Sequence, residues 1–169
     1  RNDNIDGSDA SYRDGGSYSG HINRNTYKFL EVKDMLAIRH QDGSKLVKQK
    51  GQGLFSGQER ERCKIYLVQV YDKDPARIYS KEIWYLDGET WMIPYKELWD
   101  KQGRLWRFLD SMLGYKQTLK GDPVVCQVSY NTTDQIRLHG CPNRNKDQLF
   151  GIELSPDLFT VQYIQRMGY

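Results

Sequence analysis

The chain has 169 residues, of which 38% are hydrophobic, and this length supports one domain with a buried core. Its net charge of +3 arises from 25 basic and 22 acidic residues in mixed order. The chain lacks the dense basic stripe that is typical of a nucleic-acid-binding protein. No run of 18 apolar residues occurs, so no membrane span is expected.

Residues 1–20 contain mostly Asp, Gly, Ser, Asn and Tyr and almost no aliphatic side chains. Such a composition cannot build a core, so we expect a flexible linker or a tail tied down by its neighbours. The antiparallel β domain then covers residues 21–169. Because the chain begins at Arg1 rather than Met, we expect it to be the C-terminal part of a longer protein.

The first strands are predicted from alternating apolar residues. Residues 27–32 and 35–40 have strand character on either side of Lys33-Asp34, and a glycine- and lysine-bearing loop follows over residues 41–57. Residues 63–71 form a further strand, which ends at Asp72-Lys73-Asp74-Pro75.

Residues 78–108 contain all four tryptophans of the chain. Turn signals at Asp87-Gly88 and at residues 100–103 divide this stretch into three pieces, which predicts a three-stranded antiparallel meander. Pro94 should mark an edge, a bulge or a bend. Large side chains fall on both faces of the meander. Since a small sheet normally needs one apolar face, we expect a covering layer, a ligand cavity or a partner.

A hairpin is predicted from residues 124–130 and 135–139, which alternate around a polar turn. Folding it about Thr133-Asp134 places Cys126 opposite Cys141, within disulfide distance. We favour this disulfide, and with it an oxidising compartment, over two free thiols. Cys63 would remain unpaired and buried.

The C-terminal region is predicted to hold a strand over residues 149–154. Ser155-Pro156 is a helix-start signal, and residues 159–167 could continue a short helix or form a last strand. Seven to nine strands with short connections give a mainly β (α+β) fold, a single antiparallel sheet that is open or curled and has few short helices.

The order of motifs in the meander resembles that of a known family. The motifs are Arg77 to Asp87, then Thr90-Trp91, then Trp99-Asp100 with Gly103 and the close Leu105-Trp106-Arg107; residues 25–35 also look like a family segment. In this respect the chain resembles uncharacterised Gram-negative periplasmic proteins known as outer membrane lipoprotein-sorting proteins, a domain-of-unknown-function family. The resemblance covers about residues 22–115 and fits the C-terminal part of the family.

The resemblance implies a lipoprotein-carrier-like fold: a curved antiparallel sheet or incomplete β-barrel, with helices plugging an apolar cavity. It further implies a periplasmic location, possible association with the outer membrane, and a role in envelope transport beside export systems. It supplies no catalytic residues.

The aromatic residues of the meander are the candidate ligand-binding residues. Three readings stay open: a core built from cross-strand pairs, the wall of a cavity for a lipid or another apolar ligand, or a protein-docking surface. The candidates are Trp84, Trp91, Ile93, Tyr95, Trp99, Trp106 and Phe108.

The chemistry-bearing residues favour a non-catalytic protein. The three histidines, His21, His40 and His139, lack metal-ligand spacing, and the sequence has no nucleophile elbow, phosphate loop or dinucleotide fingerprint, so we expect no metal and no cofactor. The leading hypothesis is a periplasmic protein that binds a lipid or another apolar ligand in envelope transport or lipoprotein sorting. The alternative is a structural or adaptor subunit that docks on an envelope or export-system protein.

Overall fold

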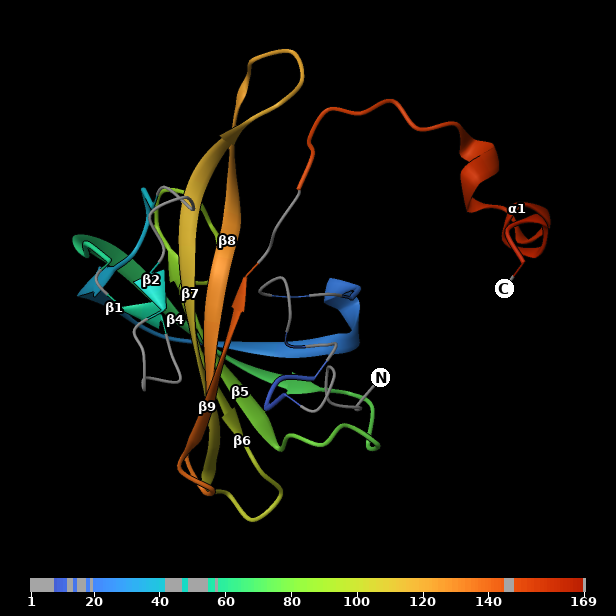
Figure 1. Ribbon diagram of the computed structural model, residues 1–169. Helices are drawn as coiled ribbons and strands as arrows, with labels where there is room; N and C mark the ends of the chain where they lie inside the picture. The colour runs from blue at the N-terminus through green and yellow to red at the C-terminus, as the bar shows by residue number, and fades with distance from the viewer. Residues whose placement is uncertain are drawn as a thin grey trace.

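The computed structural model describes residues 8–11, 14, 18, 20–41, 47–48, 55–56, 58–144 and 148–168. Its main element is a seven-stranded antiparallel sheet in the order β1-β4-β5-β6-β7-β8-β9 (Figure 1). The strands are β1 Asn25–Ala37, β4 Glu61–Asp72, β5 Lys81–Asp87, β6 Tyr95–Trp99, β7 Leu105–Gln117, β8 Pro123–Asp134 and β9 His139–Arg144. The smaller elements are the pair β2 Val47–Lys48 and β3 Phe55–Ser56, the 3₁₀ helices η1 Ile22–Arg24 and η3 Pro156–Phe159, and the helix α1 Val161–Arg166.

The sheet is curved (Figure 1). It is unclosed, because β1 and β9 form its two edges and do not pair with each other. The predicted fold class, a mainly β protein with a curved antiparallel sheet and few short helices, is confirmed. Every sheet neighbour except β1 and β4 is also a neighbour in the chain, which is the order that short connections produce. None of the helices described is long and apolar enough to cross a bilayer.

The first strand is longer than predicted. Lys33 and Asp34 do not break it but pair with Ile65 and Lys64 of β4. The physical reason is that β1 is an edge strand whose residues are almost all exposed, so charged side chains in its middle remain solvated. Most of the predicted loop 41–57 and residues 1–7 of the predicted tail lie outside the described residues.

The three-stranded meander is confirmed as β5, β6 and β7. Pro94 lies directly before β6, and its carbonyl accepts a hydrogen bond of 2.7 Å from the Ser111 amide. The proline therefore sits where no ladder donor is required of it.

Close approach of two backbones explains a glycine in β7. A side-chain Cβ at Gly114 would lie 2.1 Å from the carbonyl oxygen of Gln41. The Gln41 amide donates to the Leu113 carbonyl at 2.9 Å, and the Leu113 amide donates to the Ile38 carbonyl. Gly114 thus allows the segment after β1 to lie along β7.

The predicted disulfide is wrong, and Cys126 and Cys141 are free thiols. The hairpin turns over residues 135–138, so that Asp134 pairs with His139, and Cys141 therefore lies opposite Thr132. Cys126 pairs with Gly114 on the other side of β8. The side chain of Asp134 accepts hydrogen bonds from the Ile136 and Arg137 amides, which fixes the turn later than predicted.

The C-terminal residues form an arm that projects from the sheet (Figure 1). The predicted strand over residues 149–154 is absent, and these residues are irregular. The helix-start signal is confirmed: the Ser155 side chain accepts from the Asp157 amide, and Pro156 occupies the first turn of η3. Residues 161–166 are helical, which decides between the two readings of this segment.

The N-terminal segment lies on one side of the sheet and the β2–β3 pair on the other (Figure 1). We call its described residues the strap; they are Ser8, Asp9, Ala10, Ser11, Asp14 and Tyr18. Ala10, Ser11 and Asp14 are fully buried, although this segment has almost no aliphatic content. The strap is therefore part of the folded domain and covers one face of the sheet.

Candidate functional site

The predicted aromatic wall is divided between the two faces of the meander. Trp84 of β5 pairs with Lys96 of β6, whereas Tyr85 pairs with Tyr95. Since directly opposed residues share a face and neighbours along a strand alternate, Trp84 and Tyr95 point to opposite sides of the sheet.

One face carries the strap and will be called the strap face. Across β5, β6 and β7 its residues form two rows, Glu82–Leu98–Arg107 and Trp84–Lys96–Leu109. Trp84 is buried against Val70 and Ile93, and the ring of Tyr18 from the strap lies 4.7 Å from its ring. Ala10 packs farther along this face with Leu98, Leu109 and Tyr130.

The opposite face has its own apolar cluster. Tyr95 and Phe108 stack with ring centroids 5.8 Å apart, and Tyr85 meets Tyr95 edge-on. Ile65 and Leu67 of β4 complete this cluster. The Tyr95 hydroxyl donates a hydrogen bond of 2.6 Å to the Leu36 carbonyl, so this phenol is satisfied inside the protein.

The other three tryptophans stand at the margins of the sheet. Trp91 is 64% exposed, has a φ of 58° and stacks on Tyr66. The Lys81 ammonium lies 4.1 Å from the Trp99 ring. Trp106 is half-buried and donates to the Asp134 carboxylate at 2.9 Å. The structure thus brings Trp84 and Ile93 together on the strap face. It brings Tyr95 and Phe108 together on the opposite face, so the candidate residues do not line one common surface.

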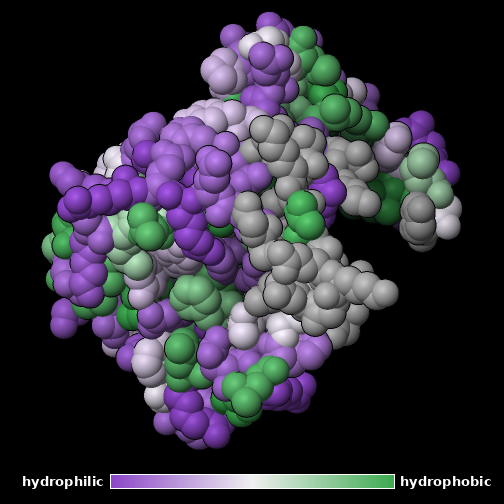
Figure 2. All heavy atoms as spheres, turned by 60° about the vertical axis from the view of Figure 1, so that its left-hand side comes forward, coloured by the Kyte–Doolittle hydropathy of each residue, from purple (hydrophilic) through white to green (hydrophobic). Residues whose placement is uncertain are grey.

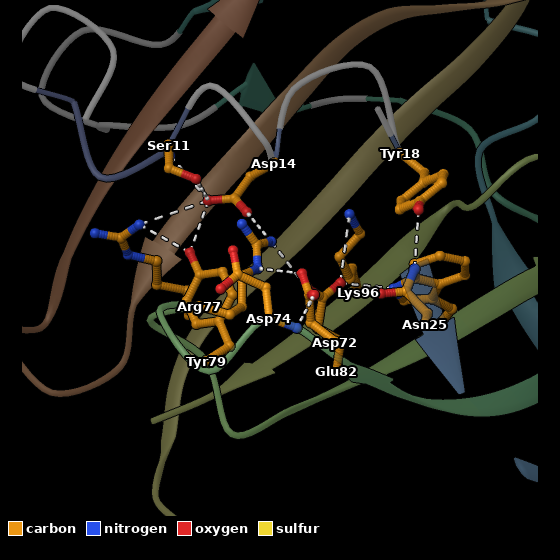
Figure 3. A network of polar contacts seen from close by, with 12 residues as sticks. Ser11, Asp14, Tyr18, Asn25, Asp72, Asp74, Arg77, Tyr79, Glu82 and Lys96 are labelled. Carbon is orange, nitrogen blue, oxygen red and sulfur yellow. Dashed lines mark hydrogen bonds and ion pairs between the residues drawn. The ribbon is translucent and has the colours of Figure 1, made fainter. Parts of the chain in front are cut away.

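A network of buried charges crosses the strap face, and Figure 3 shows most of its members. Asp14 of the strap stands at its centre. Its Oδ2 accepts hydrogen bonds of 2.8 Å from the Ser11 amide and hydroxyl and of 2.7 Å from the Tyr79 hydroxyl. Two guanidinium groups flank the same carboxylate, with Arg107 Nη1 3.5 Å from Oδ2 and Arg77 Nη2 3.7 Å from Oδ1.

The network continues from Arg77 along β5 and β6. Arg77 donates to Glu82 at 2.9 Å, and the second oxygen of Glu82 accepts from the Trp84 indole at 2.7 Å. The Lys96 ammonium lies 3.9 Å from Glu82, and its side chain is only 2% exposed. Buried charges are costly unless they are paired, so these groups hold one another in place.

Tyr79 connects the strap to the sheet. Its hydroxyl accepts a hydrogen bond of 2.9 Å from Arg107 while it donates to Asp14. Burial raises the pKa of Tyr79, and the neighbouring carboxylate of Asp14 raises it further. The phenol therefore stays protonated at neutral pH and remains a donor toward the strap.

The ionic contacts of the network are incomplete as hydrogen bonds. Asp14 Oδ1 and the Nε and Nη1 atoms of Arg77 are buried and make no hydrogen bond. The separations of 3.5 and 3.7 Å between Asp14 and the two guanidinium groups exceed the 2.7–2.9 Å of a strong charge-assisted bond. The site therefore retains donor capacity that the Asp14 carboxylate does not use.

Two cavities beside the strap-face network are lined mainly by polar residues. The inner one has a volume of about 40 Å³ and is lined by Tyr18, Asn25, Asp72, Arg77 and Glu82, among others. A hollow of about 660 Å³ lies outside it and is lined by His21, Asn23, Arg24, Asp72, Lys73 and Asp74. The inner cavity has room for water but not for an acyl chain while the strap is in place.

Candidate metal-ligating side chains are dispersed in the described part of the chain. No group of three or more His, Cys, Asp or Glu side chains suited to a metal ion occurs among the described residues. His139 contacts Asp9 of the strap at 2.6 Å, and His40 stacks on Tyr115.

Sequence reasoning missed the charge network. Arg77 and Arg107 are noted only as parts of the family-like motifs, Glu82 and Lys96 are assigned no role, and Asp14 lies in a segment predicted to be a flexible linker or a tail. Strand alternation supplied a usable signal, because Glu82 and Lys96 share a face with Trp84. The contact with Asp14 joins positions 65 residues apart and had no sequence signal.

Residues 2–165 match the family described as a protein of unknown function (DUF1329). The chain belongs to this family. The match covers the strap, the sheet and most of the C-terminal arm. No functionally curated protein matches the chain significantly.

Three solved structures share the fold. A domain from Vibrio parahaemolyticus, named for outer membrane lipoprotein sorting, superposes with a TM-score of 0.65 at 19% identity and matches 98% of this chain and 57% of its own. A DUF1329 protein from Desulfovibrio piger gives 0.50 at 13% identity over 61% of this chain and 42% of its own. A LolA superfamily protein from Nitrosomonas europaea gives 0.52 at 12% identity over 84% and 51%.

The chain spans about half the length of these solved relatives. At these identities the similarity establishes the fold, a LolA-like sheet, and the expected lipoprotein-carrier-like architecture is confirmed to that extent. The helical plug that this resemblance implied is not seen over the strap face, where the described covering residues belong to the strap.

Proposed function

We propose that this DUF1329 chain is the sheet-bearing part of a non-catalytic periplasmic carrier that binds a lipid or another apolar ligand in envelope transport. The observation that carries the proposal is the strap face. It combines buried apolar residues of a LolA-like sheet with a cover whose described residues contribute Ala10 and Tyr18 as hydrophobic contacts.

A polar cover over an apolar face suits the replacement of that cover by an apolar ligand. The free energy of burying apolar surface is about 25 cal/mol per Å², and a strap with few apolar side chains adds little apolar surface of its own. An acyl chain in its place would keep Trp84, Leu98 and Leu109 buried and would also bury its own apolar surface. Ligand and strap would therefore compete for the same face.

The proposal is tested by native mass spectrometry and lipid extraction of protein purified without detergent from a Gram-negative periplasm. We expect a substoichiometric lipid adduct that disappears after delipidation and returns when the protein is incubated with membrane lipids. A protein that remains free of lipid under all three conditions would contradict a carrier role.

A second candidate function is an adaptor that docks on an envelope protein, and the C-terminal arm favours it. The arm exposes a series of large apolar side chains, and Figure 2 shows hydrophobic residues on the part of the molecule that projects at the upper right. They are Leu149, Ile152, Leu154, Phe159, Val161, Ile164 and Met167, with exposures between 42% and 73%. An exposed series of this kind is typical of a contact surface.

Deletion of residues 149–169 separates the two functions. Under the carrier proposal the shortened chain still acquires lipid, because the strap face is intact. Under the adaptor proposal it loses a crosslinked envelope partner that the full chain retains.

A further inference from the structure

We propose that Arg77, Arg107 and Tyr79 form a subsite for the anionic headgroup of an amphipathic lipid, and that Asp14 of the strap occupies this subsite as an internal substitute. The inference rests on the proposed carrier function and names the chemical class of its ligand. The geometry of the buried network supports this inference.

The side chains of the subsite are suited to binding an anion. Two guanidinium groups and a protonated phenol converge on one carboxylate from the strap (Figure 3). Arginine has five N–H donors in a fixed fork that suits carboxylates and phosphates. Arg77 and Arg107 are 5% and 3% exposed, so their charges are held inside the protein rather than in water. Asp14 is the carboxylate that stands between them.

Asp14 fits this subsite poorly. Its Oδ2 is shared by Ser11 and Tyr79, whereas Oδ1 makes no hydrogen bond at all. Arg77 has two buried N–H-bearing atoms without a hydrogen bond, Nη1 and Nε, of which Nε lies 3.7 Å from the Asp72 carboxylate. A phosphate monoanion or diester offers more oxygens than a carboxylate, spread over a larger group, and so could reach donors that Asp14 leaves unused.

Apolar clusters lie on both sides of the subsite. Leu98, Leu109 and Tyr130 lie on the side of Ala10, and Val70, Trp84 and Ile93 lie on the side of Tyr18. A charged centre between two apolar clusters matches a ligand with one anionic headgroup and more than one hydrocarbon chain. A free phosphate would use the centre only, and a neutral lipid would use the flanks only.

The strap is held on the sheet by few contacts among its described residues. Besides Asp14, its contacts include the hydrogen bond between the Asp9 carboxylate and the His139 ring at 2.6 Å, and the His139 side chain is 66% exposed. Exposed contacts of this kind contribute little to stability. Among the described residues, the buried contacts that hold the strap are therefore the polar ones of Asp14 and the apolar ones of Ala10 and Tyr18. An anion that displaces Asp14 would remove the charged part of this hold.

The test compares ligands that differ only in the headgroup. Isothermal titration calorimetry measures the binding of dioctanoyl phosphatidylglycerol, of dioctanoylglycerol with the same chains, and of inorganic phosphate, each below its micellar concentration where it has one. We expect the anionic lipid to bind tightest, the neutral lipid to bind about tenfold more weakly, consistent with loss of one charge-assisted contact, and phosphate to bind weakly.

Variants assign the preference to the subsite. Asp14→Asn removes the internal anion with little change of shape, so the anionic lipid should bind about tenfold tighter because the strap competes less. Arg77→Gln should remove the preference for the anionic lipid over the neutral lipid. Arg62→Gln is the matched control, since the Arg62 side chain is 76% exposed on β4.

A second readout follows the strap itself. Trypsin cleavage between Arg13 and buried Asp14 should accelerate when the anionic lipid is added, and should be fast without lipid in Asp14→Asn. This readout keeps the proposal testable if Arg77→Gln fails to fold.

The outcomes separate the two proposals. If neither lipid binds the wild-type protein, the carrier function fails and the headgroup subsite with it. If both lipids bind equally, or if Asp14→Asn changes neither the affinity for the anionic lipid nor the cleavage rate, the carrier function stands and the headgroup subsite is overturned.

Discussion

The hydroxyl of Tyr79 donates a 2.7 Å hydrogen bond to the carboxylate of Asp14, which lies 65 residues earlier in the chain. The same hydroxyl accepts from Arg107 of β7. One phenol therefore joins the strap, the segment before β5 and the centre of the sheet, and all three groups are buried.

Tyr79→Phe is expected to destabilise the protein by about 1–3 kcal/mol, because a buried carboxylate and a buried guanidinium each lose a hydrogen-bond partner. Urea denaturation followed by tryptophan fluorescence measures the change. Tyr115→Phe is the control, since Tyr115 is 43% exposed, and its loss should stay within about 0.5 kcal/mol. Equal effects of the two substitutions would contradict the structural role of the Tyr79–Asp14 contact.

Trp84 and Trp91 should differ sharply in their contributions to stability. Trp84 is 7% exposed and packs against Val70, Ile93 and Tyr18, so Trp84→Ala should cost about 3–5 kcal/mol. Trp91 is 64% exposed and contacts the ring of Tyr66, so Trp91→Ala should cost less than about 1.5 kcal/mol. Urea midpoints for both variants check the difference, and a Trp91 variant as unstable as the Trp84 variant would place Trp91 in a core.

Asp134 should contribute to acid sensitivity. Burial opposes ionisation of its carboxyl, but hydrogen bonds from the Arg137 amide, the Trp106 indole and the Ile136 amide outweigh it and lower its pKa. Because the folded-state pKa lies below the unfolded value of about 3.9, the carboxylate stabilises the fold above that pH. This contribution is lost as the pH falls through the folded-state pKa.

Asp134→Asn should therefore be less stable than the wild type at pH 7, and the difference should shrink as the pH falls below about 4, near the unfolded-state pKa. Urea midpoints between pH 7 and pH 2.5 measure this trend. Asp122→Asn is the control, because Asp122 is exposed. A gap that is constant over the whole range would show that the charge of Asp134 makes no difference to stability.

The cysteines should behave as three free thiols. Positions 126 and 132 are about 20 Å apart along β8 at about 3.3 Å per residue, and Cys141 lies opposite Thr132. This separation exceeds the limit of about 7 Å between disulfide-bonded Cα atoms. Iodoacetamide under denaturing, non-reducing conditions should add three labels in the intact mass; a single label would restore the disulfide.

The sequence predicted best where strand formation depends on local signals. The three strands of the meander and the helix start at Ser155 follow from turn residues and side-chain alternation. It failed at the cysteine hairpin, where a local side-chain contact places the turn later than strand alternation predicted. Asp134 fixes the hairpin turn by accepting two backbone amides, and this shift moves Cys141 away from Cys126.

The sequence also predicted that both faces of the meander would need cover, but it could not say what the cover is. The aromatic candidates Trp84 and Tyr95 alternate about the sheet, and alternation alone assigns them to opposite faces. Their burial depends on segments that pack from elsewhere in the chain. Tyr18 covers Trp84, and backbone from the end of β1 receives the Tyr95 hydroxyl.

The amino-acid order by itself determined that this protein is built on one large antiparallel sheet with large apolar side chains on both faces, since strand period and turn chemistry act between near neighbours. The tertiary structure alone decided that Asp14 meets Arg77, Arg107 and Tyr79. A glycine- and serine-rich segment carries no periodicity, so its position is set by a few charges that only the folded sheet brings together.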